Sequence, residues 1–393
     1  MDVFKQMQRD LDSLAAGGLL RFPVTLDSAC GAVVTVDGRE VLCFCSNDYL
    51  SLANHPAVRS AARDAIDQWG VGTGASRLIS GSTACHVHLE RKLAAFKQTP
   101  DAVVTSTGWM ANRVAIGALA SKGDLILCDK LNHASILDAA VSSGATVRRY
   151  LHRDTNRLET LLVRYRPTAG RCLIVTDSVF SMDGDIAPLA ELAVLKKKYD
   201  AQLLIDEAHA TGVLGVAGRG AAELLGVEDD IDATVGTLSK ALGSIGGFVA
   251  GPKALIDTIR NTGRAYIYTT APPACACAAA MAALELIESS PSLRADLLTA
   301  AGDLRNRLRD AGLNTPDYGS REITPIIPVI IGEAGRTAEI AAQLLESDIL
   351  LPAIRPPTVP PGTSRLRISL CASHTPRQIN TLVHRLKEFA SVT

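Results

Sequence analysis

The sequence lacks the features of membrane, secreted and nucleic acid-binding proteins. No apolar run approaches the roughly 20 residues that a membrane-spanning helix needs. The first residues, Met1-Asp-Val-Phe-Lys5, have neither the basic nor the apolar region of a signal peptide. A formal net charge of −1 gives no broad attraction to nucleic acid or to an anionic membrane surface. We therefore expect a cytoplasmic protein that binds neither nucleic acid nor membrane.

Cysteine pairs with redox or metal-site spacing are also missing, and aromatic residues are scarce. The nine cysteines are scattered and form no Cys-x-x-Cys motif, which fits a reducing compartment and predicts no metal site. Aromatic residues make up only 4% of the chain, whereas 47% of it is hydrophobic and 31 residues are glycine. This composition is typical of an α/β enzyme rich in Ala, Val and Leu, and it disfavours a β-sandwich or a disordered chain.

At 393 residues the chain is long enough to form two domains. Residues 2–16 predict an amphipathic helix, and two alternating runs around Asp37-Gly38 predict a β-hairpin. The predicted divisions are an N-terminal helix and hairpin arm (1–45), a large cofactor-binding domain (46–289) and a smaller α+β C-terminal domain (290–393).

Strand-like and helical segments alternate through the large domain. The predicted strands are 102–105, 124–128, 171–176, 202–205, 233–235 and 247–250, and the helices between them include 110–120, 134–142 and 188–199. This alternation indicates an α/β fold with a largely parallel sheet that helices cover on both faces. Ligands of such sheets lie outside the carboxyl ends of the strands, so functional residues should directly follow the strand-like runs.

Lys240 follows one of these runs, in Gly236-Thr-Leu-Ser-Lys240-Ala-Leu-Gly243. Lysine is seldom buried without a reason. Desolvation of its amine favours the neutral, nucleophilic form that Schiff-base chemistry requires. The alternative interpretation is a lysine that reaches into solvent from a loop.

Asp206 ends another strand-like run and opens Asp206-Glu-Ala-His209. A buried carboxylate there needs a cationic partner or several donors, and it could hold a proton on a heterocyclic nitrogen. It could instead cap a helix or a turn. His209 could donate to a phenolate-type oxygen, or it could be a histidine of the core. The same four letters occur in helicase motors, but a motor also needs a phosphate-binding Gly-Lys motif, and the sequence has no Gly-Lys pair.

Thr105-Ser-Thr-Gly-Trp-Met110 joins a strand to a helix, and its free backbone N–H groups suit a phosphate. It lacks the glycine spacing of a dinucleotide site, so we do not expect NAD. Ser181 and Thr237 could add hydroxyl donors, or they could simply cap turns. The imidazole of His133, just after another strand, could stack on an aromatic ring or cap a helix.

Arg365 and Arg367 lie on one face of a predicted strand, because side chains alternate with period two. Arginine on an apolar strand suits the bidentate capture of a carboxylate. The alternative is a solvated strand face.

Together, a Schiff-base lysine and an aspartate for a ring nitrogen describe a pyridoxal 5'-phosphate enzyme. Over residues 20–390 the chain resembles the α-oxoamine synthases, which are fold type I pyridoxal phosphate enzymes. The motifs that carry the resemblance are Ser46-Asn-Asp-Tyr-Leu50, Phe180-Ser-Met-Asp-Gly-Asp185, Asp206-Glu-Ala-His209, Thr237-Leu-Ser-Lys240 and Tyr268-Thr-Thr-Ala-Pro-Pro273.

The resemblance implies a role for each matching residue. Lys240 would form the Schiff base and act as catalytic acid and base, Asp206 would pair with the pyridine nitrogen, and His209 would contact the phenolic oxygen. His133 would stack on the ring. The expected catalytic residues are therefore Lys240, Asp206, His209 and His133. The residues expected around the cofactor are Gly108, Trp109, Ser181 and Thr237, with Thr269 or Thr270 reaching the phosphate of a neighbouring subunit in a homodimer with shared sites. The residues expected to contact substrate are Arg21, Asn47, Thr358 and Arg367, the last of these through the amino-acid carboxylate.

Within the family, Ile354-Arg-Pro-Pro-Thr-Val-Pro360 and Gly362-Thr-Ser-Arg-Leu-Arg367 favour one branch. That branch condenses L-alanine with pimeloyl-CoA or a pimeloyl carrier protein in biotin synthesis. The nearest alternative is a 2-amino-3-ketobutyrate ligase, which uses glycine and acetyl-CoA. Serine palmitoyltransferase is a more distant alternative. A dimeric scaffold that has lost catalysis is disfavoured, because every expected catalytic group is present. Three positions depart from the usual pattern: Trp109, Asp177 and Ser239.

Overall fold

The computed structural model describes residues 2–319 and 323–390, which form two compact units. The first unit contains residues 1–46, 182–184 and 297–393, and the second contains residues 47–181 and 185–296. The first 46 residues therefore belong to the same unit as the C-terminal residues.

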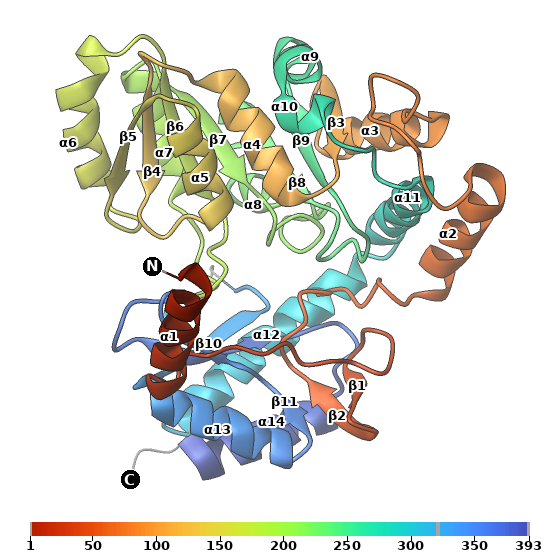
Figure 1. Cartoon of the computed structure of the whole chain (residues 1–393), viewed down its shortest axis with the longest axis vertical. Coiled ribbons are helices and arrows are strands. Elements are labelled where there is room, and N and C mark those ends of the chain that lie inside the picture. Colours follow the sequence, from red (N-terminus) through yellow and green to blue (C-terminus); the bar gives the residue numbers. More distant parts are fainter. Residues whose placement is uncertain (1, 320–322, 391–393) are drawn as a thin grey trace. The chain divides into compact units, whose positions relative to one another are not determined.

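A seven-stranded sheet forms the centre of the second unit, in the order β3-β9-β8-β7-β6-β4-β5 (Figure 1). Its strands are β3 (Asp101–Thr105), β4 (Leu125–Asp129), β5 (Thr146–Tyr150), β6 (Cys172–Asp177), β7 (Gln202–Asp206), β8 (Ala233–Thr237) and β9 (Gly247–Gly251). All of them run parallel except β9, which is antiparallel to both of its neighbours. The predicted parallel α/β sheet is thus confirmed. The predicted strand at 247–250 forms, but in the reverse direction.

Helices cover both faces of this sheet. The helices of the unit are α2 (Pro56–Trp69), α3 (Ala84–Phe96), α4 (Gly108–Leu119), α5 (Ala134–Ser142), α6 (Thr155–Tyr165), α7 (Leu189–Lys198), α8 (Ala221–Leu225), α9 (Lys253–Thr262), α10 (Arg264–Ile267) and α11 (Ala274–Ser289), with α12 (Ser292–Asp310) continuing into the first unit. Crossovers between parallel strands are right-handed, which places α4 and α5 on one face and α6, α7 and α8 on the other. Residues of α4, α5 and α9 share one buried apolar cluster with alternate residues of the strands.

Strand β5 is absent from the strands that the sequence predicted. It lies at the edge of the sheet, carries Arg148 and Arg149, and exposes most of its residues. An edge strand is partly exposed to solvent and needs no continuous apolar run. The charged residues of β5 interrupt the apolar pattern by which strands were predicted.

The first unit contains two three-stranded sheets, β1-β2-β11 and β10-β13-β12. Its strands are β1 (Val33–Val36), β2 (Arg39–Cys43), β10 (Ile326–Gly332), β11 (Ile349–Leu350), β12 (Ala353–Ile354) and β13 (Ser364–Ser369), and its helices are α1 (Val3–Ala16), α13 (Ala334–Glu346) and α14 (Pro376–Ala390). Strands β1 and β2 form the predicted hairpin, whose turn residues Asp37 and Gly38 both have positive φ.

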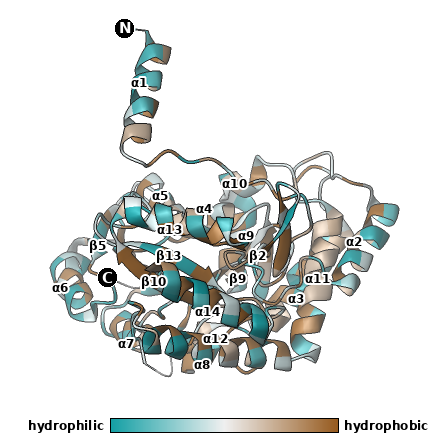
Figure 2. Ribbon diagram, turned by 90° about the horizontal axis from the view of Figure 1, so that it is seen from below, coloured by the Kyte–Doolittle hydropathy of each residue, from teal (hydrophilic) through white to brown (hydrophobic). Residues whose placement is uncertain are grey.

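Amphipathic helices account for much of the surface of the first unit. Helix α14 buries Ile379, Leu382 and Leu386 on one side, and polar residues predominate on the side that faces the viewer in Figure 2. None of the helices within the described residues has the length and apolar character needed to cross a membrane.

Candidate active site

The carboxyl edge of the sheet in the second unit gathers the segments that follow β3, β4, β6, β7 and β8. A cavity of about 200 Å³ opens there. Its lining residues are Gly108, Trp109, Asn112, His133, Ser135, Asp177, Asp206, Ala208, His209, Gly236, Thr237, Ser239 and Lys240. The structure therefore brings together seven of the predicted site residues, as expected for strand ends of one parallel sheet.

Lys240 lies in the connection between the antiparallel strands β8 and β9. Its side chain turns into the cavity, where Nζ lies 2.9 Å from Nε2 of His209. The interpretation of Lys240 as a lysine extended into solvent is therefore wrong. The other ring nitrogen of His209, Nδ1, lies 2.7 Å from the hydroxyl of the buried Tyr49. Tyr49 belongs to a motif noted in the sequence, but no role for it was predicted.

Asp206 is buried at the end of β7 and accepts two hydrogen bonds. Asn112 Nδ2 donates to Oδ2 at 2.7 Å, and the backbone N–H of Ala208 donates to Oδ1 at 2.9 Å. The aspartate thus also holds a turn, as its alternative interpretation proposed. Asn112 lies on α4, 94 residues away from its partner, and was not predicted as a site residue. Its buried Oδ1 has no hydrogen-bond partner among the described residues.

His133 caps the N-terminus of α5 and takes part in three hydrogen bonds through two of its atoms. Its backbone N–H donates to Asp177 Oδ2 at 2.7 Å, its Nδ1 lies 2.8 Å from Ser135 Oγ, and Nδ1 accepts from the backbone N–H of Ser135. The indole ring of Trp109 contacts the imidazole edge to face, with ring centroids 5.9 Å apart. The capping interpretation is confirmed, and the same contacts fix the plane of the imidazole at the cavity.

The electrostatics of this cluster favour a neutral histidine and a neutral Asp177. Burial lowers the pKa of His133; the nearby Asp206 opposes this shift and Lys240 adds to it. Burial, reinforced by the neighbouring Asp206, raises the pKa of Asp177 well above its usual value. Burial and the nearby Asp206 thus both disfavour a charge on Asp177.

Glycines let three backbone segments approach closely at one end of the cavity. A Cβ at Gly247 would lie 2.5 Å from the Thr107 carbonyl oxygen, and a Cβ at Gly108 would lie 3.4 Å from Thr237 Cβ. Thr107 caps α4 by accepting from Met110 N–H, so the helix begins directly at the cavity. The Thr237 hydroxyl lies 2.7 Å from Ser239 Oγ. This hydroxyl donates to the Gly246 carbonyl at 2.9 Å, whereas backbone amides at the start of a helix suit an anion.

Other predicted residues of this unit lie outside the cavity lining. Asn47 accepts a hydrogen bond from the Tyr49 hydroxyl at 3.1 Å. Thr269 and Thr270 lie in the segment between α10 and α11, where the Thr270 carbonyl accepts from Ser106 Oγ at 3.0 Å. Ser181 is partly buried in the segment between β6 and α7.

Arg21, Thr358 and Arg367 belong to the first unit. Arg21 donates to the Pro356 carbonyl at 2.9 Å, and Arg367 Nη1 donates to Ser369 Oγ at 2.7 Å. Arg365 forms an ion pair with Asp183, and both arginines of β13 are buried. The interpretation of this strand face as solvated is therefore wrong.

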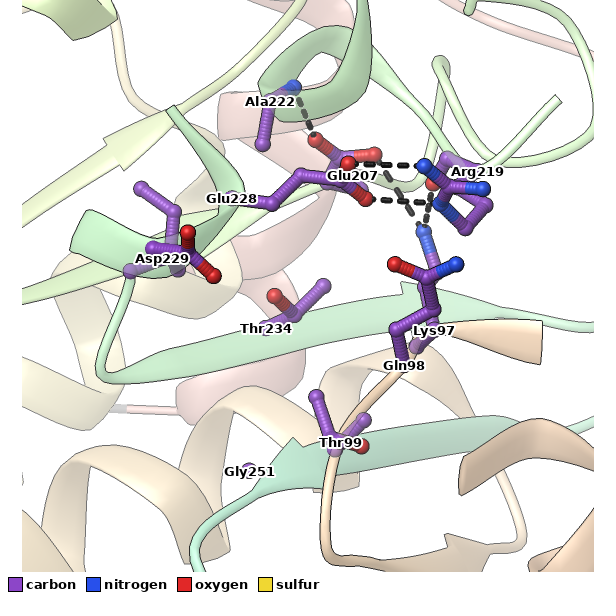
Figure 3. A pocket seen from close by; sticks show the side chains of 12 residues that line it. Lys97, Gln98, Thr99, Glu207, Arg219, Ala222, Glu228, Asp229, Thr234 and Gly251 are labelled. Carbon is purple, nitrogen blue, oxygen red and sulfur yellow. Dashed lines mark hydrogen bonds and ion pairs between the residues drawn. The ribbon is translucent and has the colours of Figure 1, made fainter. Parts of the chain in front are cut away.

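A second cavity, of about 70 Å³, contains a buried ion pair (Figure 3). Lys97 Nζ lies 3.3 Å from Glu207 Oε2 and 2.9 Å from Thr211 Oγ1, and it also donates to the Arg219 carbonyl. Glu207 Oε1 accepts from the backbone N–H of Ala222. Burial lowers the pKa of Lys97 and raises that of Glu207, and their mutual attraction opposes both shifts. Every partner of the lysine within these contacts is a protein group, which indicates a structural role.

Comparison with known proteins agrees with the geometry of the cavity. The model of the aminotransferase class I and II family matches residues 39–386. The chain is 46% identical to an 8-amino-7-oxononanoate synthase of Geotalea daltonii over 95% of each protein. Serine palmitoyltransferase of Sphingomonas wittichii superposes with a TM-score of 0.92 at 33% identity, covering 98% of this chain and 97% of that protein.

A further solved structure belongs to an 8-amino-7-oxononanoate synthase of Francisella tularensis. It superposes with a TM-score of 0.74 at 30% identity, covering 88% of this chain and 97% of that protein. These relatives share the fold over most of the chain. The chain belongs to the aminotransferase class I and II family and, within it, to the α-oxoamine synthases, which are pyridoxal phosphate enzymes.

Proposed function

We propose that this protein condenses L-alanine with a pimeloyl thioester, releasing CO₂ and the thiol carrier, to form 8-amino-7-oxononanoate in biotin synthesis. The observation that carries the proposal is the 46% identity to an enzyme of that name, together with a cavity lined by Lys240, Asp206, His209 and His133. The acyl group arrives on coenzyme A or on a carrier protein.

Pyridoxal 5'-phosphate is the cofactor of the family, and the residues present fit it. Lys240 supplies an amine for covalent anchorage, and Asp206 presents a buried carboxylate to a ring nitrogen. The unpaired Oδ1 of Asn112 and the amides at the start of α4 offer further polar contacts. When bound, this cofactor draws electrons away from the α-carbon of an amino-acid substrate through its pyridine ring.

Each side chain of the cavity then has a distinct proposed task. Asp206 would keep the proton on the ring nitrogen, and hydrogen bonds from Asn112 and Ala208 hold the carboxylate in place. The flat imidazole of His133, whose pKa burial lowers, would stack on the ring. His209 would contact the phenolic oxygen. Gly108, Trp109 and Thr237 of the cavity, with Ser181 from outside its lining, would surround the rest of the cofactor.

Proton transfer at the α-carbon falls to Lys240. Its amine removes the α-proton of alanine and later returns a proton to the product, a task that requires a neutral amine in part of the cycle. Arg367 takes the carboxylate of alanine, with Arg21, Asn47 and Thr358 as further substrate contacts.

We also propose a homodimer with shared sites, in which Thr269 or Thr270 reaches the cofactor phosphate of the partner subunit. An exposed apolar surface supports this proposal. The backbone bridge between Ser76 and Thr270 places two segments side by side, and these segments carry Val71 (75% exposed), Ile79 (80%) and Tyr268 (72%). Large apolar side chains that cluster on a surface mark an association site.

The second candidate is a synthase with a different amino acid and acyl thioester. The higher TM-score of 0.92 with a serine palmitoyltransferase favours this candidate, whereas the sequence identities of 46% and 33% favour the first. Identity is the better guide here, because one fold hosts several substrate specificities and the site decides among them. A 2-amino-3-ketobutyrate ligase is the remaining alternative.

A matrix of substrates separates these candidates. The purified enzyme would be assayed for CO₂ release with alanine, glycine and serine, each combined with pimeloyl-CoA, pimeloyl carrier protein, acetyl-CoA and palmitoyl-CoA. We expect turnover only with alanine and a pimeloyl thioester. Preferential turnover of serine with palmitoyl-CoA, or of glycine with acetyl-CoA, would establish one of the alternatives instead.

A further inference from the structure

A chain of hydrogen bonds links the segment before α2 to Lys240. The Tyr49 hydroxyl donates to Asn47 Oδ1 at 3.1 Å, and the same hydroxyl lies 2.7 Å from His209 Nδ1. On the other side of the imidazole ring, His209 Nε2 lies 2.9 Å from Lys240 Nζ. Tyr49 is fully buried, and His209 is only 5% exposed.

The direction of these hydrogen bonds follows from the chemistry of their end groups. An amide oxygen can only accept, so the single hydroxyl proton of Tyr49 is committed to Asn47. The hydroxyl oxygen can then only accept from His209, which places a proton on Nδ1. In a neutral imidazole the other nitrogen, Nε2, carries the lone pair, and Nε2 faces the amine of Lys240.

We propose that Asn47 and Tyr49 are positioning residues that hold His209 as the Nδ1–H tautomer, so that Nε2 accepts a proton from the Lys240 ammonium group. In this step an Nζ–H bond breaks and an Nε2–H bond forms. The products are a neutral lysine amine and a histidinium ion whose Nδ1–H still donates to Tyr49.

The transfer explains how Lys240 becomes nucleophilic in a partly polar cavity. Desolvation alone favours the neutral amine, but the neighbouring carboxylate of Asp206 favours the charged form. The other titratable side chains that line the cavity are His133, Asp177 and Asp206, and His209 Nε2 lies within hydrogen-bond distance of Nζ. The resulting histidinium carries a proton on Nε2, which suits the proposed contact of His209 with a phenolic oxygen.

This proposal rests on Lys240 as the amine that anchors the cofactor, but its first test, by NMR, needs neither cofactor nor substrate. Nitrogen-15 NMR of the imidazole side chains in the cofactor-free protein reports which nitrogen is protonated, and His209→Asn identifies the relevant signals. We expect a protonated Nδ1 and an unprotonated Nε2 for His209 in the wild-type protein at neutral pH.

Two variants change the tautomer for different reasons. Tyr49→Phe removes the acceptor from Nδ1. Asn47→Ala frees the hydroxyl proton of Tyr49, which can then be donated to Nδ1. Both should shift His209 towards the Nε2–H tautomer. Since Nε2 can then no longer accept a proton from Lys240, both should slow the capture of pyridoxal 5'-phosphate at pH 7 by about tenfold. Raising the pH should restore the rate of capture.

Tyr266→Phe is the matched control, because Tyr266 is equally buried in the same unit but lies outside the cavity. It should change neither the His209 signals nor the rate of capture. An unprotonated Nδ1 in the wild-type protein would overturn the proposal. So would unchanged His209 signals in both folded variants. If Tyr49→Phe does not fold, Asn47→Ala decides alone. Wrong substrates in the turnover assay would contradict the proposed reaction but would leave the tautomer measurement intact.

Discussion

Lys240 and Lys97 of the second unit lie near the consecutive residues Asp206 and Glu207, but the environments of the two amines differ. Lys240 borders the same cavity as Asp206 at the sheet edge, and its amine lies 2.9 Å from His209 Nε2. Lys97 is enclosed with Glu207 (Figure 3), and its amine contacts a carboxylate, a hydroxyl and a carbonyl. We propose that the first lysine transfers protons and that the second stabilises the fold.

The alternation of side chains along an extended backbone creates this division. Asp206 and Glu207 are adjacent, so their side chains leave the chain on opposite sides. Asp206 meets Asn112 of α4, whereas Glu207 meets Lys97 after α3 and the backbone of α8. A Cβ at Gly220 would overlap the Glu207 carboxylate, so the ion pair also depends on a glycine. One dipeptide thus borders the cavity on one side and holds a buried ion pair on the other.

The largest expected effect is on turnover, from Lys240→Ala. Loss of the amine removes both the covalent anchor for the cofactor and the acid-base group, so turnover should fall by about 10⁴-fold. The melting temperature should change little, because the Lys240 side chain is only partly buried and borders a cavity. Borohydride reduction followed by peptide mapping checks the anchor. A cofactor-labelled peptide that contains another lysine would contradict the assignment.

Lys97→Met should instead reduce stability. It leaves the Glu207 carboxylate buried without its ion-pair partner, which costs about 3–5 kcal/mol of unfolding free energy. Urea unfolding of the holoenzyme measures the loss. In the double variant Lys97→Met/Glu207→Leu much of it should be recovered, because no buried charge remains. A Lys97→Met protein with wild-type stability and lost turnover would reverse the proposed division between the two lysines.

Asp206→Asn and Glu207→Gln test the two adjacent acids. The asparagine is nearly the same size but no longer carries a charge to hold a ring proton, so turnover should fall by about 10²-fold while the fold persists. Glu207→Gln should mainly lower stability. Exchange of the alanine α-proton with solvent, followed by NMR, isolates the affected step. Unchanged exchange in Asp206→Asn would refute the role of this carboxylate.

The smallest expected effect comes from a third ion cluster of the same unit, in which His152 lies between Asp129 (3.1 Å) and Asp185 (2.7 Å). Burial opposes protonation of His152, but the two carboxylates outweigh it and raise its pKa to about 9. The folded-state pKa exceeds the unfolded value, so the stabilisation is complete below about pH 6.5 and disappears as the pH rises through 9.

After a discount for the 26% exposure of the His152 side chain, this contribution amounts to about 2 kcal/mol. Urea unfolding at pH 6.5 and pH 9.5 measures it, and His152→Gln should lack that part of the pH dependence. An equal loss of stability between the two pH values in the wild-type protein and in the variant would assign the effect to other groups.

Local patterns in the sequence predicted most strands of the large sheet and the candidate site residues that follow them. The apolar runs before Asp206 and Lys240 predicted buried strands, and both side chains follow those strands into one cavity. The Asp37-Gly38 pair predicted the hairpin turn that forms. The edge strand β5 escaped prediction, because its arginines interrupt the apolar pattern.

The partners of the reactive residues were beyond the reach of these patterns. Tyr49 and Asn112 contact residues 160 and 94 positions away in the chain. Tyr49 lies in a motif noted in the sequence, but neither contact could be predicted from neighbouring residues. Local patterns also did not predict that β9 runs in the reverse direction, or that the first 46 residues belong to the same unit as the C-terminal residues.

By itself, the sequence determined the alternation of strands and helices and the chemical groups placed at the strand ends. Both depend on residues that are close neighbours in the chain, where side-chain period and burial are set locally. Only the tertiary structure decided which lysine faces an open cavity and which is enclosed in an ion pair. Burial and hydrogen-bond partners come from segments that are distant in the sequence, and these quantities, rather than residue type, set the protonation and the reactivity of an amine.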